Sequence, residues 1–206
     1  MRHLFTQTRA GISLPIELEA EVLILPAESD DLDQPAEAKT TFLIYSLKLQ
    51  YRPPAGAALR PRIEPVEERL EYVKKGEAHA HLPFRHKSEW RDSVVKGRRT
   101  SPYISTETQE GGSRVVKLHQ DSSAKGGRPR HFQAEKLPRT VLSTVNAQEG
   151  PTAVLARREM LSWRLLQLEP VALRTPDEFD TPPRLASNGS HLARYPAPVI
   201  PGAGGA

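Results

Sequence analysis

Apolar and polar residues alternate strictly along the first part of the chain. A period of two residues is that of a β-strand, and one polar face is typical of an antiparallel sheet half exposed to water. The alternation over 12–26 therefore predicts a strand with a wet acidic face. Its apolar side holds Ile12, Leu14, Ile16, Leu18, Ala20, Val22 and Ile24, and its polar side holds Glu17, Glu19 and Glu21.

The alternation resumes over 41–51, after an acidic loop at 26–39, and predicts a long hairpin with the first strand. A Pro-Pro-Ala-Gly break at 53–56 ends this hairpin, and the pattern over 63–73 predicts a third strand. Shorter patterns predict further strands near 82–85, 101–106 and 114–119. We expect a meander of roughly five or six strands.

The period changes after Asn146. The sequence GPTAVLARREMLSW predicts a helix over 150–163, because proline suits the first helical position, and RLLQLE predicts a short strand over 164–169. Residues 193–206 are rich in Pro, Gly and Ala, which favours a disordered tail. The expected fold is therefore α+β, with an antiparallel β-rich part at 1–140, a helix-strand unit at 141–192 and a tail at 193–206.

The composition excludes several kinds of chemistry. The 206 residues include no cysteine, so disulfides, zinc sites built on thiolates and cysteine nucleophiles are all ruled out. No stretch approaches the ~20 apolar residues of a membrane span, and the N-terminal residues lack the apolar core of a secretion signal. We expect a cytoplasmic protein without membrane contact. His79, His81 and His86 lack a carboxylate in a suitable frame, so no metal site is expected.

Positive charge is concentrated in the middle of the chain. Residues 85–140 carry 13 Lys and Arg against 6 Asp and Glu, whereas the net charge of the whole chain is +4. Such clusters can neutralise phosphates of a nucleic-acid backbone without reading its sequence, and Trp90, Tyr103 and Phe132 lie nearby for stacking. A solvated basic loop is the alternative. The candidate DNA-binding residues are Lys96, Arg98, Arg99, Lys125, Arg128 and Arg130.

Several blocks of sequence carry a resemblance to a known family. They are FLIYSLKLQY, SPYISTE, VVKLHQD, NGSHL and, most specifically, SWRLLQLEPVALRTPDEF at 162–179. Together they resemble the head of an AAA/ABC-type ATPase of the RecF/SMC-like group. The resemblance implies that residues 1–140 form the antiparallel β arm of such a head and that 141–192 form the start of its helical lobe.

The same resemblance implies a role for one glutamine. Gln167 is similar to the glutamine that these ATPases place where the core meets the helical lobe, where it senses Mg²⁺ and the attacking water. In the intact family the cofactors are ATP and Mg²⁺, and the setting is linked to DNA or to defence. The alternative is that Gln167 is an ordinary wet residue between Leu166 and Leu168.

The chain departs from the family at the nucleotide site. A phosphate-binding loop needs the form G-x-x-x-x-G-K-[ST], and no Gly-Lys pair occurs in the sequence. The signature motif, the Walker B strand and the switch histidine are also missing. We therefore expect a partial ATPase-family protein, inactive alone and holding no cofactor, whose partner is the remainder of the head. The alternative is a self-standing β-rich nucleic-acid-binding or adaptor module.

Overall fold

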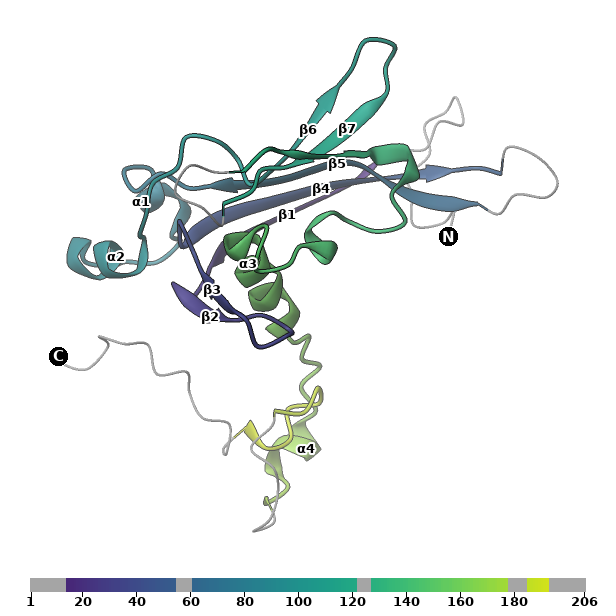
Figure 1. Cartoon of the computed structure of the whole chain (residues 1–206). Helices are drawn as coiled ribbons and strands as arrows, with labels where there is room; N and C mark the ends of the chain where they lie inside the picture. The colour runs from purple at the N-terminus through teal and green to yellow at the C-terminus, as the bar shows by residue number, and fades with distance from the viewer. Residues whose placement is uncertain (1–13, 55–60, 122–126, 178–184, 193–206) are drawn as a thin grey trace. The chain divides into compact units, whose positions relative to one another are not determined.

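The computed structural model describes residues 14–54, 61–121, 127–177 and 185–192 (Figure 1). The chain divides into two compact units, Met1–Leu161 and Ser162–Ala206. The first unit contains a six-stranded antiparallel sheet with the strand order β1-β4-β5-β6-β7-β8. This sheet, together with the helices, confirms the predicted α+β fold.

The sheet follows the order of the chain, as expected of a meander. Its main hairpin pairs β1 with β4 in the register Ile16↔Leu49 to Leu23↔Phe42, which confirms the long hairpin. The predicted acidic loop between them holds a small second sheet, in which β2 (Ala27–Ser29) pairs with β3 (Pro35–Glu37). The strands of the large sheet are β1 (Ile16–Leu23), β4 (Phe42–Arg52), β5 (Arg62–Tyr72), β6 (Ile104–Thr108), β7 (Arg114–Leu118) and β8 (Arg130–Gln133).

The strand predicted near 82–85 is wrong. No strand lies at 82–85, which instead follows the short helix α1 (Ala78–His81) and precedes α2 (Ser88–Val94). Leu82 is buried because it packs in a cluster with Phe42, Val73, Ala78 and Val95, so helix packing produced the local apolar pattern. The strand β8 was not predicted, because only Phe132 within it is an apolar residue.

The main core lies between the sheet and helix α3 (Pro151–Ser162), which confirms the predicted helix. Its first six residues, Pro151 to Ala156, are all buried, whereas the side chains after them are more exposed. Small residues in this half allow the helix to lie close to Leu43, Leu70 and Val116 of the sheet. The helix therefore contributes to the core through its N-terminal half.

The β6–β7 hairpin separates from the rest of the sheet. Strands β5 and β6 share only the pair Leu70↔Ile104, and Figure 1 shows the hairpin leaving the plane of the sheet beyond that point. The Thr106 hydroxyl accepts a hydrogen bond from the N–H of Glu68 and donates one to its carbonyl, each at 2.9 Å. The Thr106 side chain therefore takes the place of backbone hydrogen bonds between β5 and β6 where the hairpin diverges from β5.

A β-bulge interrupts the pairing of β4 with β5. Lys48 pairs with Glu67 and Leu49 pairs with Pro65, so Val66 has no opposite residue. A bulge of this kind bends its strand and re-aims the side chains beyond it. Beyond the bulge, Gln50 pairs with Glu64 and Arg52 pairs with Arg62, and the register is shifted by one residue relative to the pairs before it.

The second unit contains helix α4 (Pro170–Arg174) and a pair of backbone hydrogen bonds before it. The N–H of Gln167 donates to the carbonyl of Ser187 at 2.7 Å, and that of Glu169 donates to Asn188 at 2.9 Å. The short strand predicted over 164–169 is wrong, because this segment pairs with residues 187–188 through these two backbone hydrogen bonds alone and forms no strand; the predicted tail at 193–206 lies outside the described residues. Within the described part of the chain, no helix has the length and apolar character to cross a membrane.

Candidate functional site

The predicted basic residues fall into different environments. Lys96 and Arg98 are exposed on either side of Gly97, which bridges to Thr40. Arg128 is exposed as well, and Lys125 lies outside the described residues. The side chains of Lys96, Arg98 and Arg128 remain available to a ligand in solution.

Arg130 and Arg99 are held by other parts of the protein. The Arg130 guanidinium pairs with Glu149 at 2.5 Å and lies over the Phe132 ring, 5.2 Å from its centroid. Arg99 is directed inward, where it donates to the carbonyls of Ser101 and His119 at 2.8 and 3.2 Å. Arg98 and Arg99 are adjacent in the sequence and were predicted in one cluster. In the structure Arg98 is exposed, whereas Arg99 is directed inward.

Arg99 belongs to a buried polar network that the sequence did not indicate. Its guanidinium stacks on Tyr103, 4.2 Å from the ring centroid, and lies 3.9 Å from the carboxylate of Asp121. The Asp121 side chain is 0% exposed and accepts a hydrogen bond of 2.5 Å from the Thr152 hydroxyl. Thr152 in turn accepts one from the N–H of Lys39, at 2.9 Å. The network joins three distant segments of the first unit.

Burial is the main influence on the protonation of Asp121. It raises the pKa of this carboxyl above its ordinary value, while Thr152 and Arg99 act in the opposite direction. The carboxylate lies at the N-terminal end of α3, where the helix dipole also favours negative charge. These contacts join the loop that carries Asp121 to the N-terminal end of α3 and to Arg99, so we assign Asp121 a structural role.

Gln167 lies in the second unit, on the extended segment before α4. Its side chain is exposed, and its backbone is fixed by the bond to Ser187. Leu168 on the same segment lies next to Gly189, where an added Cβ would come within 2.9 Å of the leucine side chain. The segment therefore presents Gln167 to solvent from a backbone held by residues 187–189.

In the described part of the chain, no three His, Cys, Asp or Glu side chains come together in a way that could bind a metal ion. The three histidines singled out in the sequence have separate partners. His79 contacts the carbonyl of Gly76, His81 contacts the carboxylate of Glu21, and His86 contacts the carbonyl of Phe84.

No family model, curated protein or solved structure matches this chain. The function must therefore be argued from the residues and their geometry.

Proposed function

We propose that this chain supplies the β arm and the start of the helical lobe to an ATPase head of the RecF/SMC-like group. The order of elements supports the proposal. An antiparallel sheet is followed by α3, then by an extended segment that carries Gln167, and then by a helix that begins at Pro170. This is the order that the sequence resemblance implies.

The observation that carries the proposal is a run of exposed apolar side chains around Gln167. Leu165 is 93% exposed, Val171 78% and Leu168 55%. Burial of apolar surface is worth roughly 25 cal/mol per Å², so leaving several large side chains in water forgoes several kcal/mol. A covering surface is what the remainder of an ATPase head would provide. The exposed set around Gln167 in the second unit is Trp163, Leu165, Leu166, Leu168, Val171 and Leu173.

In this proposal Gln167 reaches a nucleotide that other residues of the head hold. We expect the chain itself to bind no ATP, since its sequence has no G-x-x-x-x-G-K-[ST] loop to surround the phosphates. Once the head is complete, the Gln167 amide would orient Mg²⁺ or the attacking water. Its fixed backbone suits this role, because a positioning residue must itself be held in place.

The test begins with the DNA on either side of the reading frame. A phosphate-binding loop encoded upstream, with a signature motif and Walker B strand downstream, is the expected result. Co-expression of those segments with this chain should then give an assembly that hydrolyses ATP. The chain alone should show no saturable ATP binding by calorimetry, and micromolar binding by the chain alone would contradict the proposal.

A matched pair of variants tests the assigned residue. Gln167→Ala should abolish most ATP hydrolysis by the assembly while leaving ATP binding intact. Gln148→Ala changes another exposed glutamine, in the first unit, and should leave hydrolysis unchanged. Equal activity in both variants would remove Gln167 from the mechanism.

A second candidate, a nucleic-acid-binding module, is favoured by an exposed aromatic cluster. The Phe84 ring lies 5.2 Å from Trp90 and 5.6 Å from His86, and Phe84 is half exposed. Rings of this kind stack on bases, and Lys96 and Arg98 are exposed cations that could contact phosphates. Binding of single-stranded DNA that weakens with salt and with Phe84→Ala would favour this function. Absence of binding at low salt would eliminate it.

A further inference from the structure

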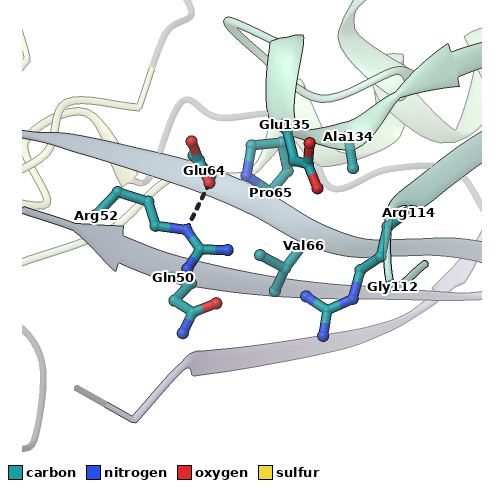
Figure 2. Close-up of a pocket in the computed structure, with 9 residues that line it drawn as sticks. All are labelled: Gln50, Arg52, Glu64, Pro65, Val66, Gly112, Arg114, Ala134 and Glu135. Carbon is teal, nitrogen blue, oxygen red and sulfur yellow. Dashed lines mark hydrogen bonds and ion pairs between the residues drawn. The ribbon is translucent and has the colours of Figure 1, made fainter. Parts of the chain in front are cut away.

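A polar pocket opens at the bulged end of the sheet, and we propose that it binds a phosphate or another small oxyanion. Its volume is about 260 Å³. Gln50, Arg52 and Glu64 line it from β4 and β5, Arg114 lines it from β7, and Glu135 lines it from the turn that follows β8 (Figure 2). Gln50 lies in the FLIYSLKLQY block of the ATPase resemblance, but none of the five belongs to the predicted DNA-binding set.

Two irregularities of the sheet coincide with the pocket. The bulge at Val66 changes the phase of β5, so that Gln50 and Glu64 become opposite neighbours. The β6–β7 hairpin pairs with β5 only at Leu70, so Arg114, at the far end of β7, has no strand partner on β5. Val66 lines the pocket between these two features.

A buried carboxylate holds one of the two arginines in place. The side chain of Glu64 is 4% exposed, and it accepts a hydrogen bond of 2.8 Å from Nε of Arg52. Its other oxygen forms an ion pair with Arg62. Because Nε is the atom engaged, the terminal nitrogens of Arg52 extend past Glu64 toward the pocket (Figure 2). Glu64 thus acts as a positioning residue for Arg52.

The second arginine has no partner among the residues that the structure describes. The guanidinium of Arg114 forms no hydrogen bond or ion pair with any described residue, although the residue is only partly exposed. The side-chain amide of Gln50 is likewise unpaired within the described chain. Figure 2 shows the terminal groups of Gln50, Arg52 and Arg114 around the side chain of Val66. Planar guanidinium groups recognise oxyanions through paired hydrogen bonds, so these groups fit such a ligand.

Charge and size restrict the ligand further. The charged residues that line the pocket, Arg52, Arg114, Glu64 and Glu135, sum to zero, and Arg62 outside the lining adds one positive charge through its ion pair with Glu64. So small a surplus favours an anion of low charge. A volume of about 260 Å³ is just below the ~300–1,000 Å³ of drug-sized sites, so the pocket fits a small anion or one terminal group.

The test measures binding of inorganic phosphate to the full chain by calorimetry, at constant ionic strength with chloride as the balancing anion. We expect saturable binding that Arg114→Gln weakens by roughly tenfold or more, the loss of a charged hydrogen bond. Arg114→Lys should retain part of the affinity, because it keeps the charge and loses the paired geometry. Arg139→Gln, which removes an exposed arginine outside the pocket and outside the predicted DNA-binding set, is the matched control and should bind as the wild type does.

Circular dichroism verifies that each variant is folded, and Gln50→Leu serves as a second variant that leaves every charge in place. Weaker phosphate binding by Gln50→Leu supports the proposal. Phosphate binding of equal strength in the wild type, Arg114→Gln and Gln50→Leu would overturn it, as would the absence of saturable binding by the wild type. A short oligonucleotide provides the last comparison, and binding that requires Arg114 would identify a backbone phosphate as the source of the anion.

Discussion

The backbone N–H of Leu142 donates a hydrogen bond of 2.8 Å to the buried carboxylate of Glu68. The N–H of Val141 donates to the other carboxylate oxygen at 2.6 Å, and the Tyr45 hydroxyl donates at 3.2 Å. Glu68 lies in the middle of β5 and is 0% exposed. One side chain therefore ties a distant turn, which includes the short 3-10 helix Leu142–Thr144, to the centre of the sheet.

Replacing Glu68 tests this connection. In Glu68→Gln the shape is kept, but one of the two backbone N–H groups would face an amide NH₂ in place of an acceptor. An unsatisfied buried donor costs about 1–3 kcal/mol, so we expect the free energy of unfolding to fall by that amount. Urea denaturation followed by circular dichroism measures the change.

Glu107→Gln is the matched control for this variant. Glu107 is exposed on β6 and pairs with Lys117 at 2.5 Å. Exposed ion pairs contribute between about 0 and 1 kcal/mol, so the control should lose less stability than Glu68→Gln. Equal losses in the two variants would show that burial of Glu68 has no special consequence.

The sequence predicted most of the sheet because local alternation reports which face of a strand is buried. The strands β1 and β4 follow that pattern most clearly, β5, β6 and β7 do so less regularly, and α3 follows a change of period at Pro151. Alternation does not report how far a covering helix extends along a strand. Leu14 and Leu18 continue the apolar face of Val22, yet they are about half exposed, while Val22 is buried in the core with α3.

The buried polar residues were harder to predict. Glu68 did leave a signal, because it alternates with Val66, Leu70 and Tyr72 and so occupies an inward position of β5. Asp121 left none, since it lies in the loop after β7 and its partner Thr152 is 31 residues away. The different environments of Arg98 and Arg99 could not be predicted either. Nothing in the sequence indicates which of two adjacent arginines is directed inward.

The stability of the protein should depend on pH through Asp121. Burial raises the pKa of this carboxyl in the folded state, so the folded protein binds more protons than the unfolded chain above the ordinary value of about 4. Stability contributed by this group is therefore lost as the pH rises from that value through the raised pKa. Burial raises the pKa of Glu68 in the same direction.

The variant Asp121→Asn isolates this effect. We expect the free energy of unfolding of the wild type to decrease, relative to that of Asp121→Asn, as the pH rises above about 4. Urea denaturation of both proteins across the pH range measures the difference. A constant difference between them would show that Asp121 titrates alike in the folded and unfolded states.

Gly97 is a position where only glycine fits. Its φ is +87°, and a Cβ atom built on it would come within 1.8 Å of the carbonyl oxygen of Lys39. Gly97→Ala would therefore break the bridge to Thr40, and we expect a loss of at least about 2 kcal/mol in the free energy of unfolding. Gly76→Ala is the control, since nothing lies within 4 Å of its added Cβ. A shift in melting temperature for Gly97→Ala alone would confirm the difference.

Substitutions of Arg98 and Arg99 should separate an effect on DNA binding from an effect on stability. Arg99→Ala removes two hydrogen bonds to backbone carbonyls and the stacking on Tyr103, so we expect a loss of roughly 2–4 kcal/mol. Arg98 is exposed, and Arg98→Ala should change stability by less than about 0.5 kcal/mol. Any DNA binding should weaken in Arg98→Ala, because this side chain is free to neutralise a phosphate. Thermal melts and DNA titrations of both variants decide the matter, and an unstable Arg98→Ala beside a stable Arg99→Ala would reverse the roles assigned to the two residues.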